Sequence, residues 1–190
     1  MKAVLSVAAV LFCMSFVYGQ GLALKEVGGA VGYSSISFNG GSSSESLGGF
    51  VISGHVNLGE LMNQLEFIPE VQYMSTSKDV SGLTWKVSDF AINANVHYNI
   101  AMEGKIKPYV GAGLGYNALS STVNLPSYTL FGFTYGGEVT NSASRIGINI
   151  LAGANYALNE KMLLFIEPRY VLASDFNHFL LKVGASFAMQ

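Results

Sequence analysis

Hydrophobic and polar residues alternate with a period of two from Ala23 to the end of the chain. Stretches rich in Gly, Ser and Asn and short polar turns interrupt the alternation. Because successive side chains of a β-strand point to opposite faces, this pattern predicts strands with one apolar face. Eight segments follow it, at about 26–36, 47–58, 65–73, 85–100, 107–118, 145–156, 162–172 and 178–187.

The clearest segment is 85–100, where one face is apolar and the other is polar or small. Phe90, Ile92 and Val96 share the first face, and Asp89 and Asn93 lie on the second. The segments 107–118 and 145–156 show the same division, with alternate glycines on the second face of 107–118. An all-β fold follows, in which every strand has one face suited to an apolar environment.

Composition decides what that environment is. The mean hydropathy is +0.37 and charged residues make up only 12% of the chain, so a large apolar surface must face something other than water. After the amino-terminal segment, no apolar run approaches the roughly 18 residues of a membrane-spanning helix. A closed β-barrel is the other structure that pairs every backbone group within lipid. We therefore predict an eight-stranded antiparallel up-and-down transmembrane β-barrel.

The amino-terminal segment has the form of a secretory signal. Met1 and Lys2 precede an apolar run that extends to Val17, and Val17-Tyr18-Gly19 fits a cleavage site before Gln20. We expect residues 1–19 to be removed and 20–190 to form the barrel domain. Lys2 is one of 10 basic residues, so cleavage leaves 9 against 12 acidic ones. The only cysteine is also removed, and the scattered basic residues give no nucleic-acid-binding surface.

Three stretches resemble the outer-membrane β-barrel family of small OmpA- and opacity-like proteins, a porin-type family of eight-stranded barrels. KPYVGAGLGYN at 107–117 resembles its glycine-rich fifth strand, and LEFIPEVQY at 65–73 and LLFIEPRYVL at 163–172 resemble its third and seventh strands. The terminal KVGASFAM at 182–189 is similar to the signal that such barrels present to their assembly machinery. The resemblance implies a location in the outer membrane, with lipid, lipopolysaccharide and the barrel-assembly machinery as partners.

The connections between strands predict how such a barrel is oriented. Residues 59–63, 101–106 and 157–160 form short connections, whereas 37–46, 75–83 and 119–144 are longer. Outer-membrane barrels place short turns in the periplasm and long loops outside. We expect Ile92, Val96, Leu114, Ile148 and Val183 to face lipid. Two aromatic girdles should border this band: Tyr98, Tyr156 and Phe187 near the short turns, and Phe50, Tyr73, Phe90, Tyr116 and Phe179 near the long loops.

Charged residues on the opposite face must lie inside the barrel. An eight-stranded barrel has an interior that side chains just fill, so buried charges there have to pair. We predict a lumen plugged by an ion-pair network, and a proton or ion path through the lumen is the alternative. The predicted members of the ion-pair network are Glu66, Glu70, Arg145, Glu167, Arg169 and Lys182.

No residue pattern points to catalysis, a metal or a cofactor. His55 and His97 also face inward, but no further ligands accompany them at metal-binding spacing. Ser53 and His55 form the only close Ser–His pair of this kind, and both point into the lumen, where a lipid substrate cannot reach. We therefore expect a protein that is not an enzyme.

The connection 119–144 carries apolar residues that are unusual in a solvent-exposed loop, among them Tyr128, Phe131, Phe133 and Tyr135. Exposed apolar clusters often mark binding surfaces, so an extracellular ligand is one expectation. An extension of the two flanking strands with self-packed aromatic residues is the other. For the whole chain, a structural or adhesive barrel is weighed against a small-solute channel. A soluble lipocalin-like barrel that binds an apolar ligand is the third possibility.

Overall fold

The computed structural model describes residues 22–38, 46–80, 83–131 and 133–189, and nearly all of them lie in antiparallel strands. Eight strands are long and one, within a turn, has three residues. In chain order they are β1 Glu26–Phe38, β2 Ser46–Asn57, β3 Glu60–Met62, β4 Leu65–Val80, β5 Leu83–Asn99, β6 Ile106–Leu130, β7 Phe133–Ala157, β8 Met162–Ala173 and β9 Phe176–Ala188.

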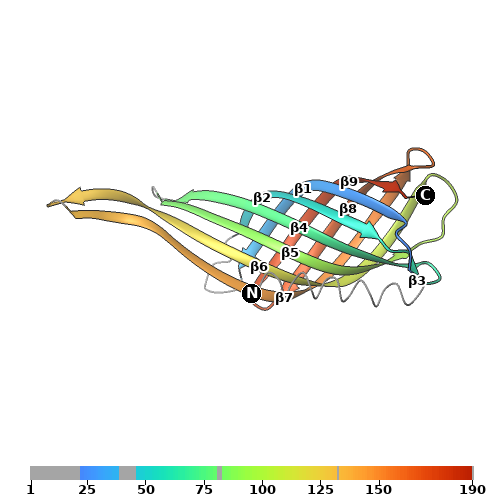
Figure 1. Ribbon diagram of the computed structural model, residues 1–190, viewed down its shortest axis with the longest axis horizontal. Helices are drawn as coiled ribbons and strands as arrows, with labels where there is room; N and C mark the ends of the chain where they lie inside the picture. Colours follow the sequence, from blue (N-terminus) through green and yellow to red (C-terminus); the bar gives the residue numbers. More distant parts are fainter. Residues whose placement is uncertain (1–21, 39–45, 81–82, 132, 190) are drawn as a thin grey trace.

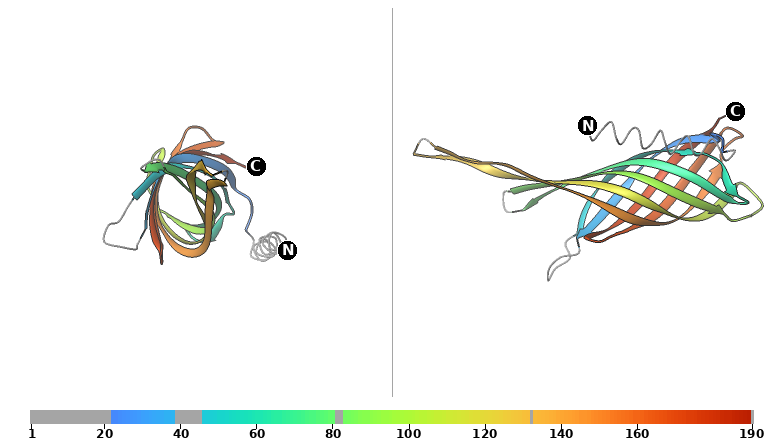
Figure 2. Two further views of the ribbon diagram at one scale, coloured as in Figure 1. Left: turned by 90° about the vertical axis from the view of Figure 1, so that its left-hand side faces the viewer. Right: turned by 60° about the horizontal axis from the view of Figure 1, so that its bottom comes forward.

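The eight long strands close into a barrel (Figures 1 and 2). Each strand pairs with its neighbour in sequence, β2 pairs directly with β4, and β1 pairs with β9 from Glu26↔Ala188 to Phe38↔Phe176. Closure gives every strand two partners over the barrel height, so no sheet edge is left there. The predicted eight-stranded up-and-down barrel is confirmed.

The two ends of the barrel differ. At the end we call the turn end, β1 begins, β9 ends, and the connections are residues 58–64, 100–105 and 158–161. Asn159 shapes the last of these, because its Oδ1 accepts hydrogen bonds from the backbone N–H groups of Lys161 and Met162, each at 2.9 Å. The opposite, loop end carries the connections between β1 and β2, β4 and β5, β6 and β7, and β8 and β9.

At the loop end, β6 and β7 continue far beyond the barrel as a two-stranded hairpin (Figure 1). Their pairing runs from Ile106↔Tyr156 to Leu130↔Phe133, with a register shift between Leu125 and Tyr128. The predicted extension of the two flanking strands through residues 119–144 is therefore confirmed for the backbone, and the expected extracellular ligand stays a prediction. Residues 75–80 also differ from the expected long loop, because β4 continues through them and pairs with β5 as far as Val80↔Leu83.

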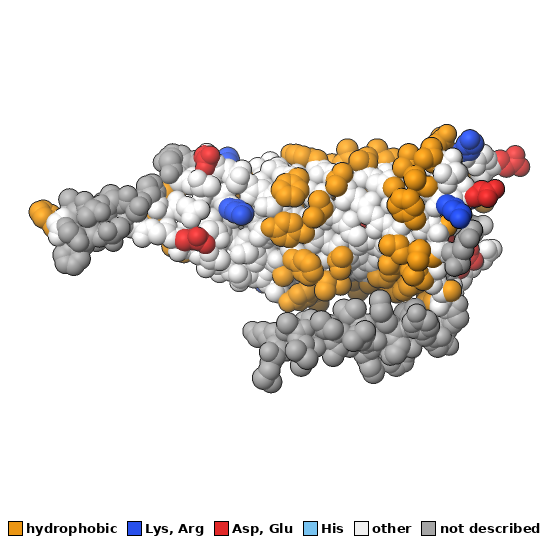
Figure 3. Space-filling view, turned by 45° about the horizontal axis from the view of Figure 1, so that its top comes forward, with side chains coloured by type: hydrophobic (Ala, Val, Ile, Leu, Met, Phe, Trp, Pro, Cys, Tyr) orange, Lys and Arg blue, Asp and Glu red, His pale blue; other side chains and the backbone are white. Residues whose placement is uncertain are grey.

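On the face of the barrel shown in Figure 3, apolar side chains cover much of the wall and charged side chains gather toward its two ends. Leu114, Ile148 and Val183 are exposed on this outer wall, and Ile92 and Val96 are half-buried on the same face. All eight residues predicted for the girdles are exposed, together with Tyr33 and Tyr170. The outer wall thus has the arrangement expected of a surface in contact with lipid.

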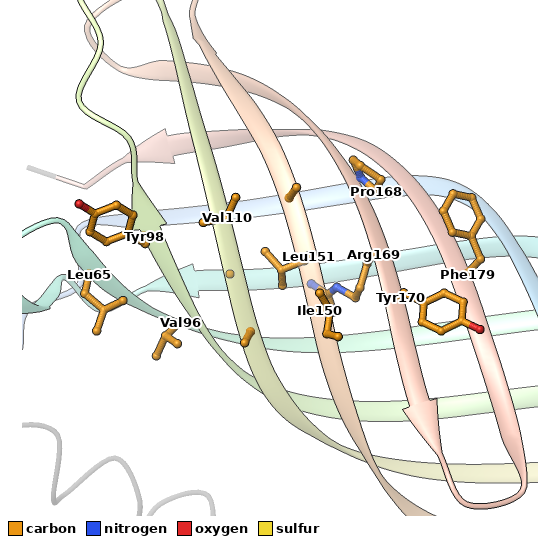
Figure 4. A pocket seen from close by; sticks show the side chains of 13 residues that line it. Leu65, Val96, Tyr98, Val110, Ile150, Leu151, Pro168, Arg169, Tyr170 and Phe179 are labelled. Atoms are coloured by element: carbon orange, nitrogen blue, oxygen red, sulfur yellow. The ribbon is translucent and has the colours of Figure 1, made fainter.

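Pro69 and Pro168 lie inside β4 and β8, and neither proline causes a bulge. The β4–β5 register passes through Pro69 unchanged. Opposite Pro168, the β7–β8 ladder stops at Leu151↔Arg169 and resumes in the same register at Ala154↔Ile166. A missing N–H therefore interrupts the ladder without shifting it. Beside Pro168, an apolar groove of about 620 Å³ crosses the outer wall (Figure 4).

No helix in the described part of the chain is long and apolar enough to span a membrane. The predicted signal peptide, residues 1–19, lies outside the described residues.

Candidate functional site

Four charged side chains meet inside the barrel, and their exposed fractions are only 1–4%. Arg169 forms a bidentate pair with Glu70, with Nη1–Oε1 and Nη2–Oε2 distances of 2.7 and 3.0 Å. Its Nη2 also lies 2.8 Å from Glu167 Oε1. Lys182 Nζ joins the same two carboxylates at 2.7 and 3.0 Å. Two positive and two negative charges balance, so each buried charge has compensation.

The register of the strands brings these residues together. Glu167 lies opposite Lys182 across β8 and β9, while Glu70 projects inward from the other side of the barrel on β4. Tyr109 on β6 adds a hydrogen bond from its hydroxyl to Glu167 Oε2 at 2.9 Å. The Tyr109 ring passes over Gly153, where any Cβ atom would overlap it. Glycine on β7 is therefore required for this contact.

Amide and imidazole groups surround the ionic cluster. Asn93 Nδ2 lies 3.3 Å from Glu70 Oε1, and Asn149 Nδ2 donates to the side-chain oxygens of Asn93 and Asn95 at 3.0 and 2.9 Å. The His97 ring stacks on Tyr109 with centroids 4.5 Å apart. A cavity of about 40 Å³ lies beside the cluster, and its lining includes His97. We use the name ionic layer for the four charged residues together with the side chains around them, Asn93, Asn95, His97, Tyr109 and Asn149.

Toward the loop end the interior becomes apolar, which the sequence analysis did not predict. Eight buried side chains pack together there, and we call them the apolar layer: Ile36, Leu47, Val51, Met74, Val87, Val171, Phe176 and Leu180. Alternation gave little signal for them because apolar residues occupy both faces of the strands at this level, as at Phe50-Val51-Ile52. A run of apolar residues on both faces was the available clue.

Two residues predicted for the ion-pair network lie outside it. Arg145 has inward parity on β7, but it sits at the loop end, where its side chain is 40% exposed and pairs with Asp175. Glu66 lies near the turn end, 3.9 Å from Lys25 Nζ. Parity fixes the side of the wall that a residue faces but not its height along the barrel axis. The structure therefore brings together Glu70, Glu167, Arg169 and Lys182 only.

The inward histidines His55 and His178 contact serines on other strands of the barrel. His55 Nε2 lies 3.0 Å from Ser186 Oγ, and Ser53 Oγ has no hydrogen-bond partner among the described residues. His178 is hydrogen-bonded to Ser34 and is fully buried. Within the described ranges, no three His, Cys, Asp or Glu side chains are arranged to hold a metal ion.

The hairpin presents a second kind of feature, an open strand edge. β5 covers the edge of β6 as far as Asn124, whereas β8 pairs with β7 only from Gly147 onward. Between Phe133 and Ile146, the outer edge of β7 therefore has no strand partner among the described residues. Phe131 at the tip is 92% exposed. The side chains of Tyr128, Phe133 and Tyr135 lie outside the described part of the structure.

Solved structures with a similar fold are outer-membrane barrels. Neisserial surface protein A, from Neisseria, is 20% identical with a TM-score of 0.56, covering 86% of this chain and 97% of that one. Ail, the attachment invasion locus protein of Yersinia pestis, solved with the heparin analogue sucrose octasulfate, is 13% identical with a TM-score of 0.53; coverage is 87% and 99%. OprG of Pseudomonas aeruginosa is 11% identical with a TM-score of 0.51, and the match covers 90% of this chain and 99% of that one. No curated protein sequence matches significantly.

The family is given by the sequence match rather than by these distant structures. Residues 4–187 match the family described as outer membrane protein beta-barrel domain. The apolar outer wall agrees with this match and disagrees with the soluble lipocalin-like alternative, whose exterior would be charged. The chain belongs to the outer membrane protein β-barrel family, and its place is the outer membrane.

Proposed function

We propose that this protein is a structural and adhesive outer-membrane barrel whose interior is closed. Its external hairpin is the surface that binds a partner. In this proposal the signal peptide is cleaved near Gly19 and Gln20, the turn end faces the periplasm, and the loop end faces outward. The role is not catalytic. The observation that carries the proposal is the ionic layer, in which Arg169 and Lys182 are each paired with both Glu70 and Glu167.

Two layers in series support the closed interior. In the ionic layer the charged groups already satisfy one another, so a passing ion would have to break charge-assisted hydrogen bonds in a buried site. In the apolar layer an ion would lose its hydration without gaining polar partners. A small-solute channel, the alternative function, would need both layers to open.

Planar-bilayer recording of the refolded protein tests the closed interior. We expect no steady single-channel current, or only a very small one, at moderate voltage. The protein must first be shown to be folded, by its heat-modifiable mobility on gels, because an unfolded sample would also be silent. Large, steady channels from folded wild-type protein would refute the closed interior and favour the channel.

The open edge of β7 supports an adhesive role. An unpaired edge offers a row of backbone N–H and C=O groups to which an extended peptide can add as a further strand. Proteins usually protect such edges with charges or proline. Between residues 133 and 146, this edge carries only Glu138 and Arg145 and no proline. We therefore propose an extended segment of an extracellular protein as the partner.

Binding of a sulfated sugar, such as the heparin analogue sucrose octasulfate in the Ail complex, has less support here. The hairpin of β4 and β5 carries Lys78 and Lys86 beside Asp79, and the strands of the β6–β7 hairpin add Glu138. These two basic and two acidic residues balance, whereas polyanion recognition needs a surplus of basic groups. Lipopolysaccharide binding through the hairpin is weakened by the same balance.

Shortening the hairpin tests the adhesive role without disturbing the barrel. Residues 125–137 are replaced by Asn-Gly, which joins the paired residues Asn124 and Glu138 through a two-residue turn. We expect unchanged heat-modifiable mobility, because rigid scaffolds tolerate changes in protruding segments. Binding of bacteria or proteoliposomes to immobilised extracellular-matrix proteins should fall to the level of empty controls.

A pair of proline variants distinguishes the strand edge from the hairpin as a whole. Val139→Pro and Thr140→Pro remove adjacent N–H groups, which point to opposite sides of β7. One variant disturbs pairing with β6, and the other removes a donor from the free edge. Loss of binding in the edge variant, with an intact hairpin, supports strand addition. Full binding by the shortened protein would remove the adhesive proposal while leaving the closed interior untouched.

A further inference from the structure

A separate pocket lies at the root of the hairpin, above the apolar layer. Its volume is about 130 Å³. Phe38, Val87, Leu119 and Phe176 contribute apolar surface, and Val87 and Phe176 belong to the apolar layer itself. The pocket therefore offers a preformed apolar floor at the loop end, as small-molecule sites usually do.

The rim of this pocket is polar and carries one charge of each sign. Arg145 on β7 and Asp175 in the β8–β9 turn face each other there and form an ion pair. Arg145 Nε donates to Asp175 Oδ2, and Arg145 Nη1 donates to the Ser144 carbonyl at 2.9 Å. The side chains are 40% and 53% exposed, so both can still meet a ligand. Ser121 and Asn141 add hydrogen-bonding groups to the same rim.

We propose that this pocket binds a free α-amino acid with an apolar side chain, of the size of leucine or phenylalanine. The ligand's carboxylate meets the Arg145 guanidinium, which has donors beyond the two already used. Its ammonium meets Asp175, and its side chain enters the apolar floor. The neighbouring opposite charges of Arg145 and Asp175 match a zwitterion better than a ligand with one charge. A ligand with a single charge would pair with one of these two groups and leave the other without a partner or repel it.

The chain supplies its own reporter for this binding. Trp85 is the only tryptophan, and its ring stacks on Phe38, with centroids 5.9 Å apart. Trp85 Nε1 donates to Ser121 Oγ at 2.7 Å. Both Phe38 and Ser121 line the pocket. A ligand on the floor should therefore change the Trp85 fluorescence.

The experiment titrates folded full-length barrel in detergent micelles with leucine and follows Trp85 fluorescence. N-acetyl-leucine, which is only anionic, and leucine amide, which is only cationic, serve as matched probes. We expect a saturable change with leucine and roughly tenfold weaker binding of each single-charge probe, the effect of losing one charge-assisted hydrogen bond. No saturable change with leucine, or equal affinity for all three probes, would overturn the proposal.

Three variants locate the site. Arg145→Gln should weaken leucine and N-acetyl-leucine binding while leaving leucine amide binding unchanged, and Asp175→Asn should show the reverse preference. Ala143→Phe fills the pocket from the rim and should abolish the response of all probes. Lys86→Gln, an exposed cation outside the pocket, should bind leucine like the wild type. Unaltered binding in Ala143→Phe, or equal loss in Lys86→Gln, would place the response elsewhere.

Discussion

Arg169 illustrates how much a single inward side chain can determine in this protein. Its guanidinium is almost completely buried and contacts both Glu70 and Glu167. Removing a single partner from a buried ion pair leaves uncompensated charge, and this costs more than the pair itself contributes. The stability of the ionic layer therefore depends on all four charges being present.

Arg169→Met should lower the free energy of unfolding by ~3–5 kcal/mol, because Lys182 alone then faces two buried carboxylates. Urea unfolding of the protein refolded in lipid vesicles measures the loss. Lys25→Gln is the matched control, since the Lys25 pairs are half-exposed and lie at 3.8 and 3.9 Å. That control should change stability by less than ~1 kcal/mol. Similar losses in the two variants would contradict the role given to burial.

Asp89 gives the opposite prediction. It is fully buried on β5, and neither carboxyl oxygen has a hydrogen-bond partner among the described residues. Asp89→Leu should raise the free energy of unfolding by ~1–3 kcal/mol, because it removes an unsatisfied polar group. Asp79→Asn, at an exposed site, should be nearly neutral in the same urea assay. A clear destabilisation by Asp89→Leu would show that the carboxyl has a favourable role.

At the scale of single residues, the sequence predicts which side of the barrel wall a side chain faces better than its height along the barrel axis. Alternation identified Glu70, Glu167, Arg169 and Lys182 as inward, and the structure brings these four together. It also gave Arg145 the correct parity but not its place at the rim. A period of two carries no information on height, which depends on strand tilt and register around the closed barrel.

At the scale of elements, the eight strands could be predicted wherever one face meets the apolar surroundings. The prediction stopped short along β6 and β7 because the hairpin leaves the barrel there. Beyond Leu119, neither face of the hairpin is required to be apolar, so the alternation weakens although the backbone pairing continues to Leu130↔Phe133. Pairing with a neighbouring strand, rather than side-chain pattern, maintains these strands.

The outer face of β7 yields a prediction about where the lipid band ends. Ile148 lies between the girdle residues and is 52% exposed. Ile148→Arg should therefore cost ~2–4 kcal/mol in a vesicle unfolding assay, the usual penalty near the midplane. Thr140→Arg has the same parity on the same strand but lies on the hairpin, and it should have little effect. Equal effects of the two substitutions would remove the assigned lipid boundary.

At the scale of the whole molecule, the interior of the barrel is divided along its axis into a charged region and an apolar region. The ionic layer holds balanced charges toward the turn end, and the apolar layer holds packed side chains toward the loop end. The alternation along the strands predicts a single polar inner face, and only apolar runs on both faces, as at Phe50-Val51-Ile52, indicate this division. The pocket at the hairpin root follows from it, because the apolar layer provides the pocket floor.

Two barriers in series predict that opening either one alone gives no channel. Phe176→Ala with Leu180→Ala thins the apolar layer, and Glu167→Ala with Arg169→Ala thins the ionic layer while keeping Glu70 and Lys182 as a neutral pair. Each double variant should remain as silent as the wild type in planar bilayers. The fourfold variant should show step currents, because a continuous wet path then exists. All samples must first show folded, heat-modifiable mobility. Currents from one double variant alone would mean that its layer is the sole barrier, and a silent, folded fourfold variant would mean that neighbouring side chains refill the lumen.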